Sequence, residues 1–316
     1  IKAYLKTATT SDALYIKVVN RFTGKTLKPF LEKSRPLPID YTRRLKHTLI
    51  TGSSGAGKSE LIKQIAYSDI LNQDSSFILI DPAGTLAEQI AAWPESHQNN
   101  RLIYINIHPD FLPGYSPTFN PLQQSYDDLE TIVNDILITM TSILQDSEFS
   151  DTMVSILQPS LTYLIGRDKP SSLDDLMAFV AGNKTLRDEA ITFLENHNPN
   201  QAFMIEDHFG RKGTGLKSNQ TASSIKNRLH RLIGSDVFRH FLCAHETSFS
   251  LEQAILDHKI IIFSLAQKSA GTRFSVANDL GKMIIGDVMR IAQKHETRLP
   301  ITHLVIDESH NYSIPQ

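Results

Sequence analysis

The stretch Gly52–Ser59 reads GSSGAGKS and directly follows the short apolar segment His47–Thr51. Glycines allow left-handed backbone conformations, so several successive N–H groups can turn toward one anion. The next segment, Ser59–Leu71, has apolar residues at helical spacing, and the amino end of a helix carries partial positive charge. A strand, a glycine-rich loop ending in Lys-Ser and a helix form the context of a phosphate-binding loop, or P-loop. The first prediction is therefore a nucleotide-binding α/β domain.

The individual residues of this loop have separate predicted roles. Lys58 is expected to reach the β- and γ-phosphates of ATP, and the hydroxyl of Ser59 is expected to bind Mg²⁺. The predicted nucleotide-binding residues are Gly52, Ser53, Ser54, Gly55, Ala56, Gly57, Lys58, Ser59 and Glu60.

A nucleotide site of this kind also needs a carboxylate at the end of a second strand. Two predicted strands end in an aspartate, one in Asp81 and the other in Asp307. Only Asp307 is followed by another carboxylate, Glu308, whereas Pro82 follows Asp81. We therefore predict that Asp307 holds Mg²⁺ through water and that Glu308 activates the attacking water. Asp81 is either a turn or helix-capping residue or a residue at the edge of the site.

Strands and helices alternate along the chain, except in one long helical segment. Alternation of this kind predicts a mostly parallel sheet with helices on both faces. Between residues 125 and 204 apolar residues recur only at helical spacing, which indicates an inserted all-α domain. The predicted strands cover residues 47–51, 77–80, 101–107, 259–265 and 302–306, and the N-terminal segment contains a further possible strand at 13–19. The predicted domains are an N-terminal segment and linker (1–46), a discontinuous nucleotide-binding domain (47–124 and 205–316) and the all-α insertion (125–204).

Composition narrows the classes of protein that fit. The chain has one cysteine, a net charge of −2 and no apolar run of about 18 residues. A disulfide framework, a thiolate metal cluster, a polycationic chain and a membrane-spanning segment are therefore excluded within this sequence. No signal peptide is visible. Since the chain begins at Ile1 rather than Met and its last predicted strand lies close to Gln316, we expect it to be a piece of a longer protein.

Positive charge gathers in one stretch. Residues 211–239 contain seven lysines and arginines against a single acid, Asp236. Three interpretations stay open: contacts to DNA phosphates, an arginine finger reaching the nucleotide of a neighbouring subunit, or a solvated helix face. The candidate arginines for a finger or a DNA contact are Arg211, Arg228, Arg231 and Arg273.

The order of the motifs resembles one family. After the P-loop come Ile80-Asp81-Pro82-Ala83-Gly84, Phe119-Asn120-Pro121-Leu122, the helical insertion, Ser224–Leu229 and Val305–His310. This order, over about residues 45–312, resembles the type IV coupling proteins of bacterial conjugation and secretion, the TraG/TraD kind, in the HerA/FtsK superfamily of P-loop ATPases. Ala83 departs from the family, which usually has a lysine after Asp-Pro.

The resemblance implies a specific fold, assembly and activity. It implies a RecA-like core that forms a homo-hexamer and uses ATP and Mg²⁺ to move single- or double-stranded DNA. It also implies that the insertion recruits a relaxase or other cargo, that secretion-channel proteins are further partners, and that the protein works in the cytoplasm at the inner face of the membrane. Further strands of the RecA-like domain are expected beyond Gln316.

Three other functions remain open. One is a secretion-channel ATPase that powers assembly or protein export, which would be indifferent to DNA. Another is a HerA-type DNA helicase, a class that lacks so large a helical insertion. The third is a nucleotide-binding assembly module with little hydrolysis, against which the pair Asp307-Glu308 argues.

Overall fold

The computed structural model describes most of the chain from residue 44 to residue 312. Described are residues 44, 47–53, 55–107, 111, 117–123, 128–143, 150–209, 216–234, 236–266, 274–295 and 299–312, with the backbone alone at 142–143, 216–219 and 274–276. They belong to two compact units, Ile1–Ala56 and Gly57–Gln316, and each is described by itself. The predicted N-terminal segment, residues 1–46, lies almost wholly outside the described residues.

In the first unit, residues 47–53 form no regular element. The predicted strand His47–Thr51 is therefore wrong in this structure. Leu49, at its centre, is 77% exposed. The described part of this unit contains no strand beside it, and a single strand without a paired neighbour has too few hydrogen bonds to persist.

The second unit is built on a four-stranded, all-parallel sheet with the strand order β2-β3-β1-β4. This confirms the predicted α/β class and the mostly parallel sheet. Because every strand runs the same way, all four carboxyl ends meet at one edge. The strands are β1 (Ser75–Asp81), β2 (Leu102–Asn106), β3 (Ile260–Ser264) and β4 (Ile301–Ile306).

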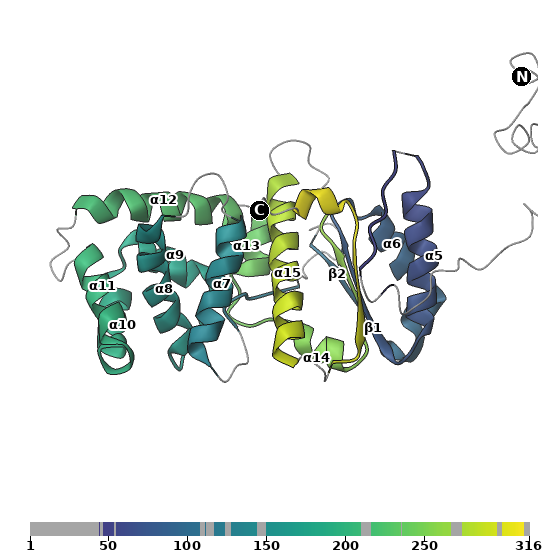
Figure 1. Cartoon of the computed structure of the whole chain (residues 1–316). Coiled ribbons are helices and arrows are strands. Elements are labelled where there is room, and N and C mark those ends of the chain that lie inside the picture. The colour runs from purple at the N-terminus through teal and green to yellow at the C-terminus, as the bar shows by residue number, and fades with distance from the viewer. Residues whose placement is uncertain are drawn as a thin grey trace, which may run out of the picture. The chain divides into compact units, whose positions relative to one another are not determined.

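Helices cover both faces of this sheet. Helices α5 (Lys58–Leu71) and α6 (Thr85–Ala91) lie on one side and α15 (Phe274–His295) on the other, with α14 (Leu251–Leu256) below it (Figure 1). All seven residues of β1 are buried as a result. A strand covered on both faces reads as a continuous apolar run, which is why Phe77–Ile80 was predictable. Two short 3₁₀ helices, η1 (Pro94–Asn100) and η2 (Ser309–Tyr312), precede β2 and follow β4.

Between β2 and β3 the described residues form helices and no strand. Before α14, which directly precedes β3, they are α7 (Leu129–Ile143), α8 (Asp151–Gly166), α9 (Leu173–Ala181), α10 (Lys184–His197), α11 (Pro199–Phe209), α12 (Leu216–Ile233) and α13 (Asp236–Leu242). The predicted insertion ends at residue 204, before α12. Helix α12 nevertheless packs on α8 and α9, within the helical part. The boundary at residue 204 stays a prediction. None of the helices in the described ranges combines the length and the apolar composition that a membrane crossing needs.

The helical part packs directly on the sheet part through α15. At the crossing of α15 and α7 a Cβ on Gly286 would lie 2.9 Å from Thr139 Oγ1, so a larger residue there would force the side chain of Thr139 to move. One cluster of buried apolar side chains continues from Ile78 and Phe263 in the sheet to Leu157 and Phe179 in the helices. The two parts therefore share a core.

A buried arginine, Arg101, holds together the amino ends of the strands. Its Nε donates to the carbonyl of His258 at 2.7 Å, just before β3. Its two terminal nitrogens donate to the carbonyls of Ile70 (2.9 Å), Asn72 (3.3 Å) and Ser75 (2.7 Å). Burial lowers the pKa of Arg101. A single cation thus satisfies carbonyls from three segments that no sequence pattern connects.

We expect Arg101→Met to destabilise the protein by about 3 kcal/mol or more, because several buried carbonyls would lose a charged donor. The matched control is Lys259→Met, whose ammonium donates to the exposed carbonyl of Asn100 and which should cost about 1 kcal/mol or less. Urea unfolding at constant m-value measures both. Equal losses for the two variants would contradict this account.

Candidate functional site

The amino end of α5 carries the last residues of the predicted phosphate loop. Gly57 is the N-cap, with a left-handed φ of 87°, and Gly55 has φ of 77° in the other unit. Residues with side chains rarely adopt such angles, which explains why glycine stands at both positions. Gly57 provides no side-chain acceptor for the first turn of α5. Amide groups at such a helix start suit an anion.

The predicted binding residues of α5 lie in its first turn. Lys58 is half-buried, and Ser59 and Glu60 are exposed. The carboxylate of Glu60 pairs with Lys63 at 2.6 Å. The helix start is therefore confirmed, whereas the P-loop as a whole is not established: residues 52–56 belong to the other unit and Ser54 lies outside the described residues.

Asp307 lies at the carboxyl end of β4, beside the end of β1. Its backbone N–H donates to the carbonyl of Ile80 at 3.0 Å, and its Oδ1 accepts from the N–H of Glu308 at 3.0 Å. Burial raises the pKa of Asp307, the hydrogen bond from Glu308 lowers it, and the charges of Asp81 and Glu308 raise it again. The charge of Lys58 lowers the same pKa. Lys58, Asp81 and Asp307 therefore share one electrostatic neighbourhood.

Asp81 has a different task, although it ends the neighbouring strand. It is fully buried; its Oδ1 accepts from the N–H of Ala83 at 2.8 Å and its Oδ2 from the N–H of Ala87 at 2.8 Å. The first amide lies in the turn before α6 and the second in the first turn of α6, so Asp81 fixes the turn and caps that helix. Gly84, with φ of 80°, lies so close to β3 that a Cβ there would be 2.6 Å from the Cβ of Ala266. The Asp-Pro-x-Gly sequence thus builds a tight turn, in agreement with the capping interpretation.

Glu308 is exposed and directly follows Asp307. Its φ of 49° is left-handed, which is unusual for a residue with a side chain. Its carboxylate pairs with Nδ1 of His310 at 3.3 Å. Unusual backbone conformations concentrate at functional sites, but a strand end followed by a 3₁₀ helix also explains this one. The predicted role of Glu308 as the base stays a prediction.

The two candidate arginines that the structure describes, Arg228 and Arg231, are not next to this edge of the sheet. Arg228 is half-buried on α12, where its Nη1 lies 3.6 Å from the sulfur of Met153, and Arg231 is exposed on the same helix. Figure 1 shows α12 in the helical part, separated from α5 by α15. Neither arginine thus belongs to the site of its own chain. Arg211 and Arg273 lie outside the described residues.

The donor groups fit magnesium only together with a nucleotide. No group of three or more His, Cys, Asp or Glu side chains in the described ranges could hold a metal ion. The site offers the carboxylate of Asp307 and the hydroxyl of Ser59. Mg²⁺ keeps several waters and takes its other ligands from one or two carboxylates and substrate phosphates. A magnesium ion carried in by phosphates matches this sparse donor set.

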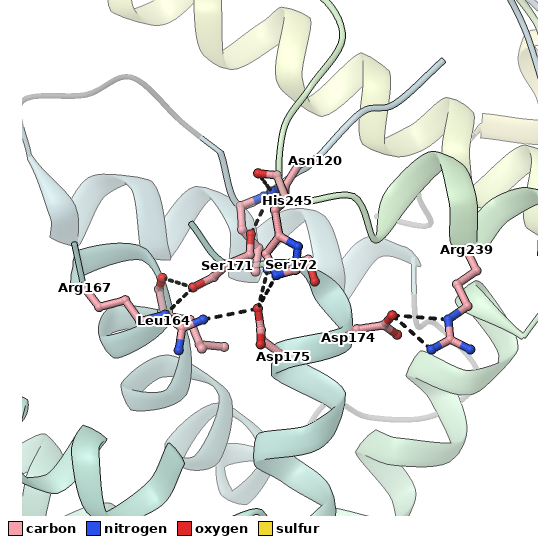
Figure 2. Close-up of polar contacts among 10 residues, drawn as sticks. Asn120, Leu164, Arg167, Ser171, Ser172, Asp174, Asp175, Arg239 and His245 are labelled. Carbon is pink, nitrogen blue, oxygen red and sulfur yellow. Dashed lines mark hydrogen bonds and ion pairs between the residues drawn. The ribbon is translucent and has the colours of Figure 1, made fainter. Parts of the chain in front are cut away.

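A second polar cluster surrounds Asn120, in the Phe119–Leu122 element. Asn120 is buried; its Nδ2 donates to the carbonyls of Ser171 (2.7 Å) and His245 (3.0 Å), and its Oδ1 accepts from the N–H of Leu122 at 3.0 Å (Figure 2). One amide side chain therefore ties the segment after β2 to the α8–α9 turn and to the segment after α13. The element has a structural task, which sequence reasoning missed.

Charged side chains extend this cluster. The carboxylate of Asp175 pairs with Arg167 at 3.2 Å and with His245 at 3.3 Å, and the neighbouring Asp174 pairs with Arg239 at 3.1 Å (Figure 2). Arg239, one of the seven basic residues in the stretch 211–239, is therefore paired within the fold. No local signal predicts the pairs with His245 and Arg239, because these two partners lie far from α9 in the chain.

Comparisons of the chain with family models, with curated proteins and with solved structures found no match. The function is therefore argued from the site itself.

Replacing Asn120 by alanine should cost about 2 to 4 kcal/mol, because two buried carbonyls and one buried N–H lose their partner. Gln123→Ala is the control. Its side-chain oxygen accepts from the exposed N–H of Thr247, so we expect a loss of about 1 kcal/mol or less. Chemical unfolding of both variants tests this, and a cost for Asn120→Ala no larger than the control's would refute it.

Asp307→Asn should raise the melting temperature of the nucleotide-free protein at pH 7. A carboxyl whose pKa is raised on folding favours the fold below its ordinary pKa and loses that contribution as pH rises through the raised value. At neutral pH the half-buried negative charge of Asp307 therefore opposes folding, and the amide of asparagine removes that charge. The gain should shrink as pH falls toward about 4. The exposed Asp74→Asn is the control; a lower melting temperature for Asp307→Asn at pH 7 would contradict the prediction.

Proposed function

We propose that this protein binds and hydrolyses ATP at the carboxyl edge of its parallel sheet. One observation carries the proposal: Lys58 opens α5 directly after the left-handed Gly57, and α5 packs on β1, whose carboxyl end lies beside Asp307 at the end of β4. Residues far apart in the sequence thus supply a cation for phosphates and a carboxylate for a metal within one neighbourhood. Among the sequence motifs, GSSGAGKS is the one that chance explains least well.

The proposed roles follow from the chemistry of each group. The loop Gly52–Ser59 binds the triphosphate, with Lys58 against the β- and γ-phosphates. Ser59 and Asp307 hold Mg²⁺, Asp307 through water, and the metal would neutralise the charge that develops on the phosphates. Glu308 activates the attacking water, and its exposed position leaves it accessible to solvent. Asp81 holds the edge of the site by capping α6.

The finer proposal is a RecA-like DNA translocase of the coupling-protein type. It is supported by the motif order and by a helical part that packs on the sheet part through α15. In this proposal a homo-hexamer at the inner face of the cell membrane pumps DNA, and the helical part recruits a relaxase or other cargo. Because Arg228 and Arg231 lie away from the site of their own chain, either of them would serve as an arginine finger only for the nucleotide of a neighbouring subunit.

A secretion-channel ATPase that acts on protein is the second candidate. The net charge of −2 favours it, because binding to a DNA backbone needs concentrated lysine and arginine. The two candidates differ in one measurable property, the response of ATP hydrolysis to DNA.

We expect Lys58→Ala to reduce ATP hydrolysis by about 10²-fold or more, since the charge that stabilises the transferred phosphoryl group is lost. Lys63→Ala, one turn further along α5, should leave it near the wild-type rate. Rates are measured with and without single- and double-stranded DNA, with oligomer size followed by light scattering. Stimulation by DNA supports the translocase, and DNA-independent hydrolysis supports the secretion-channel ATPase. Absence of hydrolysis in the wild type, with nucleotide binding unaffected by Lys58→Ala, would refute the proposal.

A further inference from the structure

Tyr312 closes η2, five positions after Asp307, and sequence reasoning assigned it nothing. Its side chain is only 8% exposed. Among the described residues its hydroxyl has no hydrogen-bond partner. Burying a hydroxyl without a partner costs stability, so an orphaned hydroxyl next to a candidate site requires an explanation.

The ring of Tyr312 is held in place by α15. A Cβ on Gly281 would lie 2.2 Å from Cε1 and 2.9 Å from the hydroxyl oxygen of Tyr312. The ring thus lies against the helix backbone at a point where no side chain fits. No described group of α15, in its backbone or its side chains, hydrogen-bonds to the hydroxyl.

Two carboxylates act on the hydroxyl from the sheet. Burial raises the pKa of Tyr312, and the negative charges of Asp81 and Asp307 raise it further. The group therefore stays a neutral O–H donor near two acceptors. Asp81 already uses both oxygens on backbone N–H groups of the α6 turn, whereas Asp307 accepts one such bond, through Oδ1. Asp307 is the carboxylate better able to accept another.

We propose that Tyr312 is a positioning residue for Asp307: in the magnesium–nucleotide complex its hydroxyl donates a hydrogen bond to the Asp307 carboxylate. This inference rests on the proposed function. The bond would fix which face of the carboxylate meets the metal-bound water, and it would satisfy the hydroxyl only when ligand is present. The ligand-free protein carries the cost of the orphaned hydroxyl, and binding removes that cost.

The test is Tyr312→Phe, which keeps the ring and removes the hydroxyl. Without ligand, the variant should melt at the wild-type temperature or above it, because an unsatisfied buried group is gone. With a non-hydrolysable ATP analogue, the Mg²⁺ concentration needed for half-maximal binding should rise about tenfold, the effect of one hydrogen bond to a charged group. Titration calorimetry and thermal melts measure both without relying on activity.

Tyr163→Phe is the matched control. Tyr163 is also a buried tyrosine, but its hydroxyl donates to Glu189 at 2.5 Å in the helical part. This variant should melt at a lower temperature than the wild type and bind Mg²⁺ unchanged. The two variants are thus expected to differ in both measurements: Tyr312→Phe changes Mg²⁺ binding without lowering the melting temperature, and Tyr163→Phe does the reverse.

A double-mutant cycle separates positioning from a general effect on the fold. In the background of Asp307→Asn, Tyr312→Phe should change Mg²⁺ binding by less than about twofold, since the two side chains act together. An unchanged Mg²⁺ requirement in Tyr312→Phe, or full additivity in the cycle, would overturn the inference and leave the proposed function intact. If the wild type binds no magnesium–nucleotide at all, both fail.

Discussion

The parallel pairing of β1 with β4 is the constraint on which the candidate site depends. Ile80 lies opposite Ile306, and the pairing continues into the N–H of Asp307, which donates to the carbonyl of Ile80. This register places two aspartates at adjacent strand ends. Helix α5, which packs on β1, brings Lys58 to the same edge. A shift of one residue in this pairing would point Asp307 to the other face of the sheet and remove the site.

The negative charges of Asp81 and Asp307 lie close together at one edge of the sheet and repel each other. Local hydrogen bonds stabilise only one of these two charges fully. Asp81 is stabilised by two backbone N–H groups, so its charge is satisfied within the fold. Asp307 is left in a neighbourhood where burial and negative charge raise its pKa. Lys58 offsets part of that charge, and a divalent cation held by phosphates would offset the rest. In the ligand-free protein the charge of Asp307 is only partly offset. This unfavourable charge is the physical basis of the affinity for magnesium–nucleotide that we propose.

The helical part is packed as a continuation of the sheet part. It shares the apolar core across α15 and α7, and the Asn120 cluster ties it to the segment that follows β2. Helix α15 also contacts η2, where Tyr312 lies beside Gly281. In the proposed motor, a structural change at Asp307 would therefore pass through η2 to α15, which contacts α7 of the helical part.

Much of this fold follows from the sequence alone, and the reason is local burial. The apolar run Phe77–Ile80 predicted β1, and the spacing of apolar residues predicted α5 and α15. The residue that follows each aspartate, Pro82 or Glu308, led us to assign the predicted metal site to Asp307 instead of Asp81. Periodicity reports which face of a segment is buried, but not what buries it. Only the tertiary structure decided the four carbonyls around Arg101, the partners of Asn120 and the contact of Tyr312 with Gly281, because each joins segments distant in the chain. For the same reason the apolar segment His47–Thr51 was predicted as a strand: composition signalled one, and no neighbouring strand pairs with it in the described part of its unit.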